Sequence, residues 1–235
     1  AGLTVHPGAG NRGSTLVNAL AAHFQQRRAE MPETVAKGFP AKERAGLVHR
    51  LDRDTTGLMV VAKTVSAHNG LAVQFAKRSA ERAYLALVFS TPRARRIINT
   101  QDAGSVEGNL ARHPQKRKEM SVAREGGRRA VTNWRVLRRM PYGCLVECRL
   151  ETGRTHQIRV HMNHIGSPVI GDRVYGDFQG LPVELRREQE KFGRQALHSA
   201  VLGFIHPDTG KKMRFESNPP ADMQRLIEVF ENYGA

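Results

Sequence analysis

Short strand-like segments dominate the apolar pattern of this chain. Five segments are rich in Val, Leu and aromatic residues and are bounded by turn residues, which is typical of strands. They cover residues 58–63, 82–89, 130–137, 144–150 and 196–206. Helical patterns stand between and around them, at residues 14–24, 66–78, 156–164 and 220–233. Because strands and helices do not alternate strictly, the pattern predicts an α+β fold with a mixed, mainly antiparallel sheet.

Length and hydropathy favour one domain. The chain has 235 residues with 40% apolar content, enough for a sizeable core, and it has no internal repeat or low-complexity linker. No apolar run approaches the roughly 20 residues of a membrane helix, and the first residues lack a signal-peptide pattern. We therefore expect a cytoplasmic protein without a membrane partner.

The two cysteines, Cys144 and Cys148, lie in one predicted strand. Alternation along the strand points both to one face without the close approach that a disulfide needs, so we expect reduced thiols. The histidines at 156, 161 and 164 have no Cys or acid beside them that would complete a zinc site. We expect no metal.

The chain carries a strong positive charge. Thirty-seven Lys and Arg residues against 22 Asp and Glu residues give a net charge of +15, which attracts polyanions. Between Arg112 and Arg139, ten residues are basic and two are acidic. A charge run is usually only a solvated face, but this density favours contact with nucleic-acid phosphates.

A glycine string near the start, Gly8, Gly10 and Gly13, has the spacing G-x-G-x-x-G. A phosphate-binding turn would need a full strand before it and an acidic residue or a P-loop lysine after it, and the sequence has neither. A turn that leads into a helix fits better, and Ser14 and Thr15 suit the capping position.

Two polar motifs are candidates for chemistry. Residues 49–58, HRLDRDTTGL, place Asp52 and Asp54 beside three cations between apolar segments. On physical grounds this segment is equally a catalytic site or a salt-bridged loop. Residues 150–159, LETGRTHQIR, leave a strand, turn and enter a helix, and Arg154 in that turn could hold a carboxylate or phosphate or be an incidental surface charge.

Together, HRLDRDTTGL and the later LETGRTHQIRVH resemble the two signatures of the RluA family of pseudouridine synthases. The resemblance extends over essentially the whole chain and includes RAYLAL, ARHPQKRKEM, GDRVYGD and RQALHS. Among subgroups, VHPGAGNRGSTLVNAL and HPQKRK look most like the enzymes that modify large-subunit ribosomal RNA. The resemblance implies the pseudouridine synthase fold, with helices and loops flanking a central sheet and an active-site cleft across it.

The resemblance implies an isomerase that converts uridine to pseudouridine in structured RNA without a cofactor or nucleotide. Asp52 would be the essential carboxylate, which either attacks the anomeric carbon or assists elimination to a glycal-like intermediate. A carboxylate stabilises a sugar carbon that becomes cationic in either route. Arg154 would pair with Asp52 and orient it. Tyr84 would stack on the uracil and transfer protons, although a tyrosine in an apolar strand is ordinarily a packing residue.

The resemblance also implies substrate contacts. Arg50 matches the residue that inserts where the target base leaves its helix. Further RNA contacts are expected from a set of basic residues, namely His49, Arg53, Lys116, Arg117, Lys118 and Arg159. Arg159 and His156 would each meet phosphate or maintain the turn. Leu51 and Ile158 would pack at the active site, while residues 54–57 would shape the loop.

Family members usually have a preceding strand and often an N-terminal S4-like RNA-binding domain, whereas this sequence opens at AGLTVHPG. We therefore expect residues 1–235 to be a catalytic domain without those parts, and we expect a monomer. Two alternatives remain: the same reaction on transfer RNA, and an RNA-binding ribosome-assembly factor.

Overall fold

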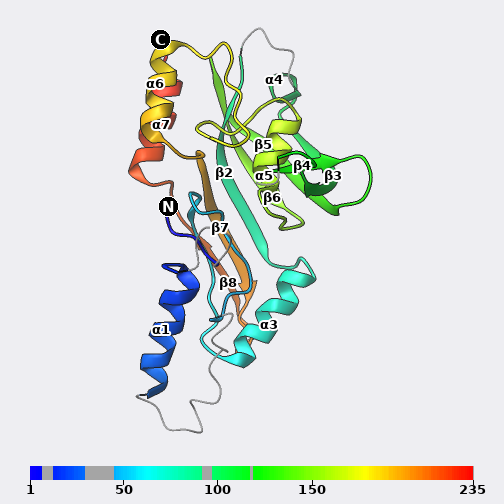
Figure 1. Cartoon of the computed structure of the whole chain (residues 1–235), viewed down its shortest axis with the longest axis vertical. Helices are drawn as coiled ribbons and strands as arrows, with labels where there is room; N and C mark the ends of the chain where they lie inside the picture. Colours follow the sequence, from blue (N-terminus) through cyan, green and yellow to red (C-terminus); the bar gives the residue numbers. More distant parts are fainter. Residues whose placement is uncertain (7–12, 30–44, 92–96, 117–118, 235) are drawn as a thin grey trace. The chain divides into compact units, whose positions relative to one another are not determined.

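The computed structural model describes residues 1–6, 13–29, 45–91, 97–116 and 119–234 (Figure 1). The chain divides into two compact units. The first unit comprises Ala1–Asp54, Leu58–Glu81 and Val201–Glu216, and the second comprises Thr55–Gly57, Arg82–Ala200 and Ser217–Ala235. Among the helices within these described ranges, none is both long enough and apolar enough to cross a membrane.

The strands form one sheet in the order β1-β7-β2-β6-β5-β3-β4, with β8 paired to β7. The strands are β1 (Thr56–Gly57), β2 (Glu81–Phe89), β3 (Ala103–Arg112), β4 (Met120–Ala123), β5 (Arg128–Met140), β6 (Gly143–Leu150), β7 (Leu197–Ile205) and β8 (Lys212–Glu216). The β1–β7 pair is parallel, whereas β2–β6, β5–β6, β3–β5, β3–β4 and β7–β8 are antiparallel. The predicted α+β fold with a mixed, mainly antiparallel sheet is confirmed.

The core of the second unit is built on β2. This strand lies between β7 and β6, and its residues Leu87, Val88 and Phe89 are fully buried. A strand with neighbours on both sides and cover on both faces must be apolar almost throughout, which explains its continuous run of apolar residues. The predicted strands at 82–89, 130–137, 144–150 and 196–206 are all present as β2, β5, β6 and β7.

Helices cover the sheet of the second unit. They are α4 (Ile97–Thr100), α5 (Gln157–His164), α6 (Val183–Phe192) and α7 (Ala221–Glu231). The pair α6 and α7 lie side by side (Figure 1), and their residues Leu185, Met223 and Phe230 are fully buried. Helix α5 packs on β4 and β5, which places its first turn next to the strand that anchors the second motif.

The first unit contains α1 (Leu16–Ala29), α3 (Val65–Ala76), the end of β7 and β8. Helix α1 begins with a reciprocal cap, in which the Asn18 N–H donates to the Thr15 hydroxyl at 3.4 Å and the Thr15 N–H donates to Asn18 Oδ1 at 3.1 Å. The capping role predicted for Thr15 is confirmed. Gly8 and Gly10 lie outside the described residues.

The predicted strand at 58–63 is wrong. Only an isolated bridge between Leu47 and Val61 forms there, and the regular pairing is confined to Thr56–Gly57. The Val60 N–H donates to the His49 ring at 3.0 Å, so a side chain takes the hydrogen bond that a neighbouring strand would otherwise accept. An apolar, β-branched run is therefore extended here without becoming a ladder strand.

The sequence also did not predict β3, β4, β8 and α6. Strand β3 reads AGSVEGNLAR, whose glycines and polar residues have low strand preference. Its pairing with β5 from Ala103 to Leu110 supplies the stabilisation that the local sequence lacks. Tertiary pairing therefore overrides the local preference of this segment.

Candidate active site

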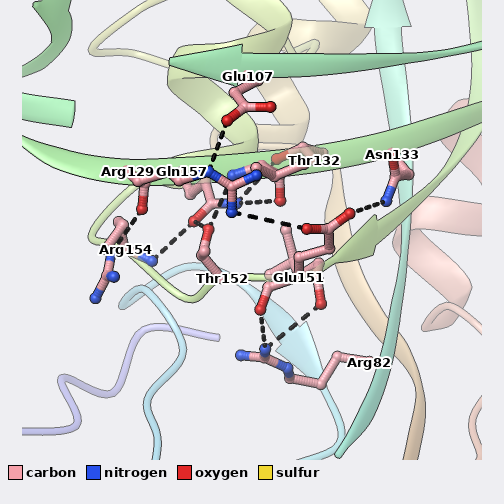
Figure 2. A network of polar contacts seen from close by, with 11 residues as sticks. Arg82, Glu107, Arg129, Thr132, Asn133, Glu151, Thr152, Arg154 and Gln157 are labelled. Atoms are coloured by element: carbon pink, nitrogen blue, oxygen red, sulfur yellow. Dashed lines mark hydrogen bonds and ion pairs between the residues drawn. The ribbon is translucent and has the colours of Figure 1, made fainter. Parts of the chain in front are cut away.

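A buried polar cluster holds the turn between β6 and α5, as Figure 2 shows. The amide of Gln157 lies at its centre and is 3% exposed. Its Oε1 accepts hydrogen bonds from the Arg154 N–H at 2.9 Å and from the Thr152 hydroxyl at 2.7 Å. Its Nε2 donates to the Val131 carbonyl at 2.9 Å and to the Thr132 hydroxyl at 3.0 Å. The full capacity of the amide is used, which fixes its orientation.

The Arg154 side chain is anchored where it leaves the turn. Its Nε donates to the Arg129 carbonyl oxygen at 3.2 Å, and Arg154 is half-buried. The Arg129 side chain donates to Glu107 at 2.6 Å and lies 4.0 Å from the Glu151 carboxylate. Figure 2 shows these residues gathered around the start of β5 and the end of β6. Strand β5 thus supports both the main chain and the side chain of Arg154.

Gly153 lies in the same turn, beside a buried guanidinium. A Cβ at this position would lie 2.7 Å from Arg82 Nη1. Arg82 donates to the carbonyl oxygens of Leu150 and Glu151 at 3.4 and 3.5 Å, and burial lowers the pKa of Arg82. Because Gly153 has no side chain, Arg82 can reach the carbonyl oxygens at the end of β6.

His156 precedes α5 with a left-handed φ of 56°, a conformation that a residue other than glycine keeps only when its surroundings hold it. Its Nδ1 lies 2.7 Å from the Tyr175 hydroxyl. The Met120 N–H donates to that hydroxyl at 2.8 Å, so Tyr175 links His156 to the start of β4. Of the two roles expected for His156, the geometry supports maintenance of the turn.

Arg159, which was expected to meet RNA phosphate or to maintain the turn, lies inside the protein. It is 5% exposed, and its Nε and Nη2 donate to the two carboxylate oxygens of Asp172 at 2.6 and 2.8 Å. Asp172 also accepts the N–H groups of Val174 and Tyr175. A buried, bidentate ion pair directs the guanidinium inward, so Arg159 supports the loop at 172–175.

The first motif begins in the first unit, where His49 closes a loop. His49 Nε2 accepts the Val60 N–H at 3.0 Å, and the imidazole stacks on Phe75 with centroids 4.6 Å apart. Arg53 pairs with Gly2 through its carbonyl oxygen and its Nε, at 2.9 and 3.1 Å. The contacts of His49 with Val60 and Phe75 close the loop at residues 49–60. His49 was expected to contact RNA.

Three residues at the end of this motif belong to the second unit. Thr55 accepts from Gln195 Nε2 at 3.1 Å, and the Thr56 hydroxyl lies 2.9 Å from His198 Nδ1. Burial lowers the pKa of His198, so its neutral ring accepts from Thr56. Gly57 has a φ of +105°, and a Cβ there would overlap the carbonyl of Ser199 on β7. All three residues shape the loop as expected.

The three residues predicted to act in catalysis lie in different units. Asp52 is half-buried in the first unit, whereas Arg154 and Tyr84 belong to the second. Tyr84 is 6% exposed on β2, opposite Cys148 on β6. Their grouping around one substrate stays a prediction.

The remaining predicted residues have these positions. Arg50, Arg53 and Lys116 are exposed, Leu51 is half-buried, Ile158 is buried, and Arg117 and Lys118 lie outside the described residues. Cys144 and Cys148 are buried free thiols, as predicted, and burial raises the pKa of Cys148 to about 12. Across the described part of the chain, no group of three or more His, Cys, Asp or Glu side chains could hold a metal ion.

The sequence did not single out the polar residues that support the motifs, chiefly Gln157, Thr152, Thr132, Arg82 and Tyr175. One signal was present in the sequence. Gln157 and His161 are four positions apart in a predicted helix, so they share one face with the apolar Val160. His161 is indeed fully buried, with its Nδ1 2.9 Å from the Thr132 hydroxyl.

Comparison with known proteins connects these motifs to a family. A family model described as RNA pseudouridylate synthase matches residues 1–164. The ribosomal large subunit pseudouridine synthase D of Zymomonas mobilis subsp. mobilis is 45% identical over 230 residues, which cover 97% of this chain and 67% of that protein. The same-named protein of Xanthomonas campestris pv. campestris is 43% identical over 239 residues, with 100% and 66% covered. This chain spans about two thirds of their length.

A solved structure agrees with this assignment. The human RNA pseudouridylate synthase domain containing 4 superposes with a TM-score of 0.63 and 25% identity, covering 78% of this chain and 75% of that one. The predicted fold class is thereby confirmed, as is the resemblance drawn from the two motifs. The chain belongs to the RNA pseudouridylate synthase family.

Proposed function

We propose that this protein isomerises uridine to pseudouridine in large-subunit ribosomal RNA, with Asp52 as its essential carboxylate. The observation that carries the proposal is the joint presence of both family motifs in a chain whose relatives are named ribosomal large subunit pseudouridine synthase D. Those names favour ribosomal RNA over transfer RNA as substrate. They also favour an enzyme over an assembly factor that only binds RNA.

The reaction breaks the bond between uracil N1 and the ribose anomeric carbon and forms a new bond from C5 to the same carbon. The C5 hydrogen is lost as a proton and N1 gains one, so the atoms balance without a redox cofactor or an added group. Asp52 acts at the anomeric carbon, where a carboxylate stabilises the developing positive charge. Both the covalent route and the glycal route use it in this position.

Arg154 orients Asp52. Two contacts of Arg154 support this role. Its main-chain N–H donates to Gln157, and its Nε donates to the Arg129 carbonyl on β5. A residue that orients a catalytic group must itself be held in place. Tyr84 contacts the uracil and takes part in proton transfer from C5. Its burial in β2 also makes it part of the core.

RNA contacts come from exposed cations. Arg50 and Arg53 lie at the surface of the first motif and Lys116 at the surface of the loop after β3, and the net charge of +15 attracts the phosphate backbone. Arg50 enters the space that the flipped uridine leaves. We further propose a cytoplasmic, monomeric protein that works without metal or nucleotide.

The test uses unmodified large-subunit ribosomal RNA and unmodified transfer RNA, each incubated with the wild-type protein and the Asp52→Asn variant. Pseudouridine is mapped by carbodiimide modification and primer extension. Wild type should produce stops in ribosomal RNA, and Asp52→Asn should produce none because the amide cannot stabilise the sugar cation. Asp54→Asn is the matched control and should retain activity, since Asp54 is assigned to the loop scaffold.

Three results would contradict the proposal. Wild-type protein that binds ribosomal RNA without forming pseudouridine would identify a binding factor. Full activity in Asp52→Asn would reject this residue as the catalytic carboxylate. Pseudouridine in transfer RNA alone would move the substrate to the alternative class.

A further inference from the structure

We propose that Gln157 is a positioning residue for the reaction and that it acts by fixing the main chain from which Arg154 extends. The inference rests on the proposed function, because it gives Gln157 a role only through Arg154. The predicted catalytic set of Asp52, Tyr84 and Arg154 did not include this glutamine. Its assignment comes from the buried cluster in Figure 2.

The orientation of the Gln157 amide is determined by its partners. Arg154 N–H can only donate, and the Val131 carbonyl can only accept. Oε1 must therefore face Arg154, at 2.9 Å, and Nε2 must face Val131, at 2.9 Å. A flipped amide would place two donors together at one end and two acceptors at the other. The buried site thus admits one arrangement.

The amide joins a rigid strand to an irregular turn. Its two donors bind residues Val131 and Thr132 of the 13-residue strand β5. Its acceptor binds Thr152 and the main chain of Arg154 in the turn. Thr152 in addition accepts the Val131 N–H at 3.0 Å. The position of Arg154 is therefore set relative to the sheet rather than by the turn alone.

If Arg154 orients Asp52, the reaction rate should depend on the Gln157 amide that holds the main chain of Arg154. Displacing a reacting or orienting group by about 1 Å can lower a rate by roughly 100-fold. Loss of Gln157 should slow the chemical step while RNA affinity is retained, because no RNA contact is assigned to the buried amide. This expectation separates a positioning role from a role in substrate binding.

Gln74 offers a matched control within the chain. In the first unit, its Nε2 donates to the Ile205 carbonyl at 2.7 Å and its Oε1 accepts the Ile205 N–H at 2.8 Å. It is likewise a glutamine that joins a helix to a strand through both ends of its amide. Neither Gln74 nor Ile205 belongs to the two motifs, so its loss should affect stability alone.

The experiment is a double-mutant cycle on single-turnover rates, measured with saturating protein so that the rate constant does not depend on the folded fraction. Gln157→Met should lower the rate by roughly 10- to 100-fold in the wild-type background and cause no further loss in Arg154→Ala. Gln74→Met should leave the rate unchanged in both backgrounds. Thermal unfolding and RNA binding are measured on each variant.

Gln157→Glu provides a second readout if Gln157→Met does not fold or if Arg154→Ala falls below detection. An ionised Glu keeps the acceptor contacts but repels the Val131 carbonyl, whereas a protonated Glu can donate to it. The rate of Gln157→Glu relative to wild type should therefore rise as the pH falls from 8 to 6. The histidines near the amide are His156, which precedes it in the chain, and His161, whose pKa burial lowers to about 4. Both are present in wild type and in the variant, so dividing by the wild-type rate removes their contribution.

Equal losses from Gln157→Met in the two backgrounds would overturn the inference, because the residue would then act independently of Arg154. A pH-independent ratio for Gln157→Glu would overturn it as well. Inactive wild-type protein would instead reject the proposed function itself. The two failures are therefore distinguishable.

Discussion

The turn at residues 150–157 and the loop at residues 49–58 are similarly polar, yet the protein holds them by different means. In the turn, side-chain amide and hydroxyl groups of Gln157 and Thr152 are buried beneath the main chain and bond to it directly. In the loop, anchoring lies at the ends, where His49 binds Val60 and Gly57 pairs with β7. The turn depends on a saturated polar cluster beneath it, and the loop depends on the positive φ of Gly57 and on separate side-chain contacts along its length.

The largest effect is expected at the end of the loop. Gly57→Ala should destabilise the protein by about 2 to 5 kcal/mol, because its Cβ meets the Ser199 carbonyl and its positive φ is strained for any other residue. Urea unfolding measures this change. The matched control is Gly126→Ala, where φ is +70° but nothing lies within 4 Å of the added Cβ.

Gly126→Ala should carry only the backbone term, about 1 kcal/mol. Equal losses for the two variants would mean that the close approach of β1 to β7 adds nothing. In that case the loop would have no special requirement for a glycine at position 57.

The polar cluster should respond to acid. Burial lowers the pKa of His161 from 6.5 to about 4, so the unfolded chain binds a proton that the folded protein does not. The stability from neutral His161 is complete above pH 6.5 and decreases as the pH falls toward 4, by up to about 1.4 kcal/mol per pH unit. Chemical unfolding at several pH values measures the slope.

His161→Asn is the reference for that measurement, because it removes the titrating ring and leaves all other acids and bases in place. The slope between pH 6.5 and 4 should be smaller in this variant than in wild type. Identical slopes would show that His161 titrates alike in the folded and unfolded states. Burial in the cluster would then not disfavour the charged form of His161.

The smallest effect is expected at the start of the loop. His49→Phe keeps the stacking on Phe75 but removes the acceptor for the Val60 N–H, so stability should fall by about 1 kcal/mol. Thermal unfolding checks this value. Pseudouridine formation should fall together with stability, because Asp52 lies inside the loop that His49 closes. Unchanged stability of His49→Phe would show that the hydrogen bond from Val60 to His49 does not stabilise the loop.

Local sequence reasoning succeeded where burial and backbone preference agree. The strands β2, β5, β6 and β7 are apolar enough to be recognised without tertiary information. It failed at β3, where Gly and polar residues pair with β5, and at residues 58–63, where His49 occupies the Val60 N–H. In both places a hydrogen-bonding partner outside the segment decides the local conformation.

The sequence by itself determined the α+β class, the family and the residues proposed to react, because two specific motifs and a strand pattern are properties of the linear chain. Only the tertiary structure decided that Arg159 faces Asp172, that His49 closes a loop and that Gln157 holds Arg154. These outcomes depend on which donor meets which acceptor after folding. Residue types alone leave that choice open, since the same Arg, His or Gln can face RNA or its own chain.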